Sequence, residues 1–141
     1  MGIINITPDS FYDGGSTVTE NSILNQAEKM LTAGATFLDI GGYSTRPNAA
    51  KVSETEEIKR VVTAVEIILK HFPDTVISID TFNSKVAKNA VETGAALVND
   101  VSGGILDPAM FKTVAKLKVP YILMHMRGTP QTMNSLTNYE N

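Results

Sequence analysis

Five short apolar runs, each ending in a polar residue, are spread along this chain of 141 residues. Four of the runs are followed by a segment whose apolar residues repeat at helical spacing. This alternation predicts an α/β fold of parallel strands joined by helices, in which the polar strand ends gather at one rim. The runs span residues 3–5, 37–39, 76–80, 97–100 and 122–125, and they end in Asn5, Asp39, Asp80, Asp100 and His125.

The predicted helices carry recognisable start and stop signals. Ser53 and Glu56 stand at capping-box spacing ahead of one apolar stripe. Gly34 and Gly94 follow two other stripes, where a glycine commonly ends a helix. Asp107-Pro108 predicts a cap and a first-turn proline for the last helix. The chain is therefore expected to hold four complete βα units and a fifth strand.

This number of units does not close a barrel, which needs eight βα units and typically about 250 residues. The chain is then either an open α/β sheet complete in itself or the first half of a larger barrel. An open sheet would leave two apolar edges free to aggregate, which natural proteins avoid. We therefore expect residues 1–141 to form one partial barrel domain whose C-terminal half is absent.

Composition narrows the possible partners. A net charge of -3 and a pI near 5.3 argue against a nucleic-acid partner or an acidic membrane surface, because both usually require a basic face. The absence of cysteine excludes disulfides and thiolate metal sites, and no apolar stretch approaches the roughly 20 residues of a membrane span. We expect a cytoplasmic protein that acts on small molecules.

The segments at the predicted rim form long, distinctive strings. They read GIINITPDSF (2–11), DIGG (39–42), STRP (44–47), SIDT (78–81) and NDVSG (99–103). In this order they closely resemble the dihydropteroate synthase family of pterin-binding enzymes. The resemblance implies a TIM (β/α)8 barrel of the pterin-binding type, incomplete in this chain.

The resemblance also implies a reaction. Members of the family condense 6-hydroxymethyl-7,8-dihydropterin diphosphate with p-aminobenzoate, giving 7,8-dihydropteroate and diphosphate in folate biosynthesis. Mg²⁺ is the expected cofactor, sulfonamides compete with p-aminobenzoate, and a homodimer is expected for the full-length enzyme.

By the same resemblance, several strand ends contact the pterin. The carboxylate of Asp80 would accept paired hydrogen bonds from an amino group and a ring N–H, and Asn99 offers both a donor and an acceptor. Val101, Ile122 and Met124 would form the apolar walls of the pocket. On sequence alone, Asp80 also fits a helix cap and Asn99 a turn former.

Other family roles fall on the first strand and on the first two loops. Asn5 resembles the metal ligand, and a single amide oxygen suits Mg²⁺, which uses few protein ligands together with phosphate and water. Asp13 and Arg46 correspond to catalytic loop residues by this resemblance, whereas opposite charges on loops are by themselves typical of a solvated surface pair. The predicted p-aminobenzoate site consists of Phe11, Thr45 and Pro47.

Two further acids are expected to have structural roles. Asp39 should order the glycine turn that follows it, and Asp100 should do the same for the loop at Gly103-Gly104.

Basic groups are scarce at the predicted rim, where only Arg46 and Arg127 stand near the site of a diphosphate. The family supplies the remaining groups from its second half, so we expect little or no activity from this chain alone. A pterin-binding methyltransferase using methyltetrahydrofolate and a non-catalytic half-barrel remain as alternatives.

Overall fold

The protein is described from a computed structural model, which covers residues 1–6, 16–43, 52–130 and 132–139. In these ranges five parallel strands form one sheet in the order β1-β2-β3-β4-β5. Parallel strands that are adjacent in both sequence and space follow the order of a (β/α)8 barrel, so the predicted α/β fold and incomplete barrel are confirmed. The strands are β1 (Gly2–Asn5), β2 (Phe37–Gly41), β3 (Val76–Asp80), β4 (Leu97–Asp100) and β5 (Tyr121–Leu123).

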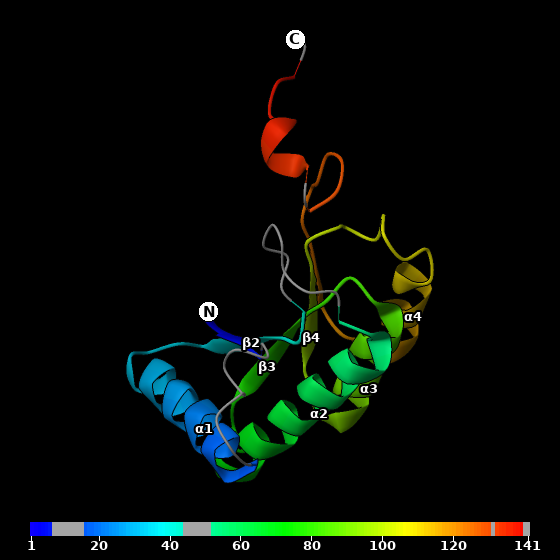
Figure 1. The fold of residues 1–141 in the computed structure, drawn as a ribbon. Coiled ribbons are helices and arrows are strands. Elements are labelled where there is room, and N and C mark those ends of the chain that lie inside the picture. Colours follow the sequence, from blue (N-terminus) through cyan, green and yellow to red (C-terminus); the bar gives the residue numbers. More distant parts are fainter. Residues whose placement is uncertain (7–15, 44–51, 131, 140–141) are drawn as a thin grey trace.

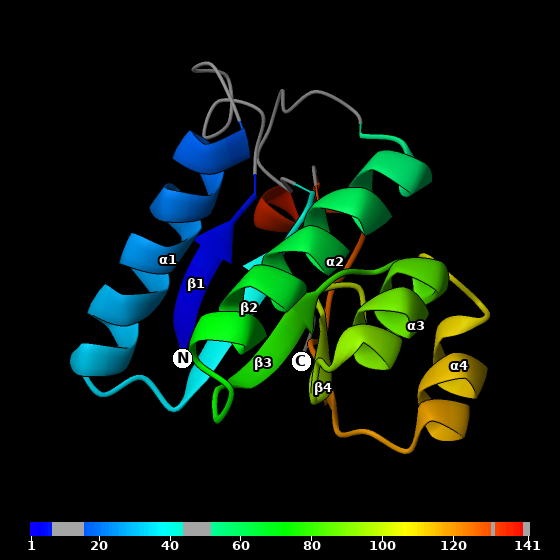
Figure 2. The ribbon, with the colours of Figure 1, turned by 90° about the horizontal axis from the view of Figure 1, so that it is seen from below.

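The connecting helices all lie on one face of this sheet. The helices are α1 (Ser16–Thr32), α2 (Glu54–His71), α3 (Ser84–Thr93) and α4 (Met110–Leu117), and a 3₁₀ helix (η2, Met133–Ser135) follows β5. The connecting helices line the lower and right-hand side of the sheet in Figure 1, α2 crosses in front of the strands in Figure 2, and the segment after β5 extends away on the opposite side in Figure 1. No helix within the described ranges is long and apolar enough to cross a bilayer.

The hydrophobic core lies between the helices and one side of the strands. Ile4, Ile40, Ile79 and Val98 are register partners on successive strands, and each is at most 1% exposed. Successive side chains of a strand point to opposite faces, so the residues that follow these four point away from the helices. We call the face of the sheet opposite the helices the open face. The packing of the core therefore decides which polar strand ends lie together on this face.

Most of the predicted helix boundaries are confirmed. Ser53 caps α2 by accepting the backbone N–H of Glu56 at 3.2 Å. The side chain of Glu56 does not complete a capping box, because it accepts from Arg60 Nε at 2.8 Å. Gly34 and Gly94 have φ of 90° and 127° just beyond α1 and α3, as expected for glycine stops.

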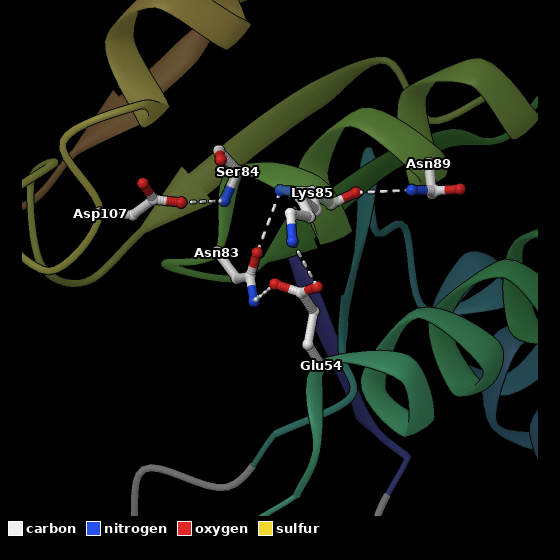
Figure 3. A network of polar contacts seen from close by, with 6 residues as sticks. All are labelled: Glu54, Asn83, Ser84, Lys85, Asn89 and Asp107. Atoms are coloured by element: carbon white, nitrogen blue, oxygen red, sulfur yellow. Dashed lines mark hydrogen bonds and ion pairs between the residues drawn. The ribbon is translucent and has the colours of Figure 1, made fainter.

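The start of α3 is tied to both of its neighbours (Figure 3). Glu54 of α2 accepts hydrogen bonds from Lys85 Nζ at 2.9 Å and from Asn83 Nδ2 at 3.2 Å. On the other side, Asp107 accepts the backbone N–H of Ser84 at 2.7 Å. These contacts hold the loop that follows β3 between α2 and the β4–α4 connection.

Asp107 also corrects one predicted boundary. Its carboxylate accepts the backbone N–H of Ala109 at 2.9 Å as well as that of Ser84, yet α4 begins only at Met110. Asp107 keeps the contact of a cap with Ala109, but Asp107 and Pro108 form the turn before the helix, and Pro108 is not its first residue.

Candidate active site

The carboxyl ends of the strands place five residues in one row across the sheet. Asn5, Gly41, Asp80, Asn99 and Ile122 are successive register partners from β1 to β5. Each of the first four directly follows a residue of the helix-facing row, so this row faces the open side. The predicted convergence of Asn5, Asp80 and Asn99 on one face is therefore confirmed.

Gly41 brings the first two polar side chains of the row together. A Cβ atom at this position would lie 3.3 Å from Asn5 Oδ1 and 3.5 Å from Asp80 Oδ2. The two side chains thus approach the same small space, one from each neighbouring strand. Because glycine has no side chain, no side chain of β2 separates them at this position.

Asn99 is held by a residue to which we assigned a different role. Its Nδ2 donates to Asp39 Oδ2 at 3.0 Å, across the intervening strand β3. The prediction that Asp39 orders the glycine turn was wrong, because Asp39 stands two residues before Gly41 and its side chain therefore points to the open face of β2. We did not predict this contact from the sequence. The two-residue spacing of Asp39 and Gly41, which places both on the same face of a strand, could have indicated it.

Two polar atoms beside this contact have no hydrogen-bond partner among the residues that the structure describes. Asp39 is 3% exposed and its register partner Ser78 is 0% exposed. Asp39 Oδ1 and Ser78 Oγ are buried without a hydrogen bond in the described part of the chain. The open face of the sheet is thus also polar two residues before the row of strand ends.

Asp80 lies in an unfavourable environment for a carboxylate. Burial, together with the negative charges of Asp39, Glu57 and Asp100, raises its pKa from 3.8 to about 6. At neutral pH the group is mainly ionised and can only accept hydrogen bonds. A ligand that donates to Asp80 would compensate for part of its lost hydration.

Asp100 has the structural role predicted for it. It is 0% exposed and accepts the backbone N–H groups of Ser102 at 2.7 Å and Gly104 at 3.0 Å. It also accepts the hydroxyl of Tyr121 at 2.6 Å. Burial and this carboxylate raise the pKa of Tyr121, so the hydroxyl remains a donor. Asp100 therefore anchors the β4–α4 loop to β5.

The predicted apolar wall residues lie near Asn99. Ile122 is its register partner and is 43% exposed, whereas Met124, just beyond β5, is 38% exposed. Val101 directly follows β4 and is half-buried. The remaining predicted site residues, Phe11, Asp13, Thr45, Arg46 and Pro47, lie outside the described residues.

The row of strand-end residues contains two possible ligands for the expected Mg²⁺. Within the described ranges there is no group of three or more acidic or histidine side chains that could hold a metal ion. Asn5 Oδ1 and Asp80 Oδ2 do approach the same space over Gly41, and both are hard oxygen donors of the kind that Mg²⁺ prefers. The residues present fit a sparse magnesium site completed by phosphate and water.

Comparison with known proteins bears on the chemistry of this row. A model of the family described as pterin binding enzyme matches residues 1–141. The chain is 55% identical to the folic acid synthesis protein fol1 of Pneumocystis carinii, over 99% of this chain and 19% of that protein. It is 47% identical to the dihydropteroate synthase of Haemophilus influenzae, over 100% of this chain and 50% of that enzyme.

A solved structure agrees with these matches. The dihydropteroate synthase of Yersinia pestis, described as a complex with a sulfonamide drug, has a TM-score of 0.84 at 43% identity. The alignment covers 100% of this chain and 50% of that chain, so the chain spans half or less of the length of these relatives. Because the family match includes every residue and the polar strand ends meet on one face, this chain belongs to the pterin binding enzyme family.

Proposed function

We propose that residues 1–141 supply the dihydropterin-binding part of a dihydropteroate synthase. The observation that carries the proposal is the register pairing of Asp80 with Asn99 on the open face. One offers a carboxylate, and the other offers an amide with both a donor and an acceptor. Together they complement a heterocycle edge that carries amino, ring N–H and ring nitrogen groups. The names of the relatives from Haemophilus and Yersinia support the same assignment.

In the proposed reaction the amine of p-aminobenzoate attacks the methylene carbon of the dihydropterin diphosphate. The new C–N bond replaces the C–O bond to diphosphate, which leaves, and the amine loses a proton. Asp80 and Asn99 hold the ring so that this carbon faces the amine. Val101, Ile122 and Met124 flank the ring and keep water away from it. Asp13 and Arg46 are proposed to act from the loops, where Phe11, Thr45 and Pro47 receive p-aminobenzoate.

Asn5 is the residue proposed to hold Mg²⁺. Its amide oxygen is a hard donor, and it lies on the open face beside the space that Gly41 leaves free. When bound, Mg²⁺ neutralises charge on the departing diphosphate. As part of the same proposal, and on the family resemblance alone, the full-length enzyme is a cytoplasmic homodimer.

The experiment that tests this function is an assay of the natural full-length polypeptide that contains these residues. We expect formation of 7,8-dihydropteroate from both substrates, and its loss when Asn99 is replaced by alanine. The purified 141-residue chain alone is expected to show little or no turnover. If the polypeptide binds methyltetrahydrofolate and neither the dihydropterin nor p-aminobenzoate, the proposed function is wrong.

A substitution at Gly41 should damage the site more than it damages the fold. In Gly41→Ala the added methyl group would lie between Asn5 Oδ1 and Asp80 Oδ2, which belong to side chains rather than to the backbone. We expect pterin affinity to fall by at least about tenfold, equivalent to 1.4 kcal/mol, with a small change in unfolding free energy. Calorimetric titration with 6-hydroxymethylpterin and urea denaturation measure the two quantities.

The neighbouring glycine provides the matched control. A Cβ atom at Gly42 would lie 2.8 Å from Val61 Cγ2 and 3.1 Å from the backbone oxygen of Glu57, both in α2. Gly42→Ala should therefore lower the unfolding free energy by about 1–3 kcal/mol through overpacking, while the folded protein still binds. Equal losses of pterin affinity in the two variants would contradict the assignment of Gly41 to the binding site and of Gly42 to packing against α2.

A further inference from the structure

Asp39 is a buried carboxylate that the proposed reaction does not use. It is 3% exposed, and of its two oxygens only Oδ2 has a partner among the described residues, the side chain of Asn99. Burying a carboxylate with so few hydrogen bonds is unfavourable, and an apolar residue would fill this place in β2 at less cost. Its contact with Asn99 is therefore the feature that needs a functional explanation.

The contact fixes which end of the Asn99 amide faces Asp39. A carboxylate only accepts hydrogen bonds, so it must meet the NH₂ group of Asn99 and not the carbonyl oxygen. One N–H is used in the 3.0 Å bond to Asp39 Oδ2. The other N–H and the carbonyl oxygen of Asn99 remain for a ligand. Their positions are fixed, because turning the amide over would place its oxygen against the carboxylate of Asp39.

We propose that Asp39 is a positioning residue that locks the Asn99 amide and thereby selects the reduced over the oxidised form of the pterin, an inference that rests on the function proposed above. The locked amide presents an N–H beside an oxygen. This pair is complementary to a ring edge on which an unprotonated nitrogen, an acceptor, lies next to an N–H, a donor. A 7,8-dihydropterin has this edge, with a bare N1 and an N8–H, whereas in the oxidised pterin both nitrogens are bare and N8 would face the oxygen.

Asp39→Asn is the sharpest variant for this inference. Asparagine has nearly the same shape and still bonds to Asn99, but it does so either as donor or as acceptor. The substitution removes the negative charge of Asp39, which also acts on Asp80, and with it the fixed direction of the hydrogen bond to Asn99. We expect the wild type to bind 6-hydroxymethyl-7,8-dihydropterin at least about tenfold more tightly than 6-hydroxymethylpterin, and the variant to reduce this ratio to about two or less.

Ser78→Ala is the matched control. Ser78 is the register partner of Asp39, it is equally buried, and its hydroxyl has no partner among the described residues. The control should keep the wild-type ratio of the two dissociation constants. A merely structural role of Asp39 would weaken both ligands equally, so an unchanged ratio in Asp39→Asn overturns the inference.

A second measurement needs neither a ligand nor a variant at Asp39. In NMR spectra of the ligand-free, natural full-length polypeptide, the side-chain amide proton of Asn99 that is bonded to Asp39 should exchange with solvent at least about tenfold more slowly than the side-chain amide protons of Asn25, which is exposed on α1. Equal rates would overturn the lock. Protection of Asn99 in a polypeptide that binds neither pterin would instead overturn the proposed function and leave the lock intact.

Discussion

Replacing Asp80 with asparagine should reduce pterin affinity by at least about a hundredfold, because charge-assisted hydrogen bonds are each worth about 1.5–3 kcal/mol. The substitution keeps the shape of the side chain and removes its charge and one acceptor. Calorimetric titration of the natural full-length polypeptide with 6-hydroxymethylpterin measures the loss. Affinity within about threefold of the wild type would show that Asp80 does not hold the ring.

The same substitution should stabilise the fold at neutral pH. The pKa of Asp80 is about 6 in the folded protein, against an ordinary value of 3.8, so the folded state binds the proton more tightly than the unfolded chain. The unfolding free energy of the wild type therefore falls as pH rises through the interval between these two values. Above pH 7 the ionised group destabilises the fold by up to about 3 kcal/mol, which asparagine should restore.

Urea denaturation at pH 4 and pH 7.5 tests this dependence. The wild type and Asp80→Asn should have similar unfolding free energies at pH 4, and the variant should be more stable at pH 7.5. Asp74→Asn is the control, because Asp74 is exposed between α2 and β3 and the exchange removes the same charge. A variant at Asp80 that is less stable than the wild type at pH 7.5 would contradict the burial of an ionised group.

Asp100→Ala should cause a large loss of stability, of about 3–5 kcal/mol, because three donors that now meet one carboxylate would lose it. The donors are the backbone N–H groups of Ser102 and Gly104 and the hydroxyl of Tyr121. The carboxylate is 0% exposed, so water has little access to replace it. Thermal and urea denaturation at pH 7 measure the effect.

Two further variants separate burial from the number of hydrogen bonds. Asp107 also accepts two backbone N–H groups, from Ser84 and Ala109, but it lies near the surface. Asp107→Ala should therefore lower stability by only about 1 kcal/mol. Tyr121→Phe removes one of the three donors to Asp100. Its loss of unfolding free energy should lie between those of Asp107→Ala and Asp100→Ala. An Asp100 variant as stable as the Asp107 variant would show that the β4–α4 loop does not depend on this anchor.

Local features of the sequence were sufficient for most of the secondary structure. The apolar runs became β1 to β5, and Gly34 and Gly94 ended their helices as expected, because strand formation and helix termination depend on neighbouring residues. The two departures involve Glu56 and Asp107. Glu56 accepts from Arg60 and does not complete the capping box. Asp107 accepts from Ala109 as a cap would, but it also accepts from Ser84 and α4 begins only at Met110.

The candidate site was only partly accessible from the sequence. Asn5, Asp80 and Asn99 were identified because each ends or nearly ends an apolar run and lies in a string shared with a known family. Asp39 occupies a similar position, and its role was nevertheless misjudged. A nearby glycine pair suggested a local turn, whereas its partner Asn99 is 60 residues away.

The sequence by itself determined the alternating strands and helices, the family and the polar strand ends, since these depend on local propensity and on contiguous strings of residues. Only the tertiary structure decided that Gly41 lies between Asn5 and Asp80, and that Asp39 holds Asn99. The physical reason is register. A shift of one residue between parallel strands would turn each side chain to the opposite face, and the register is set by packing of the apolar row against the helices.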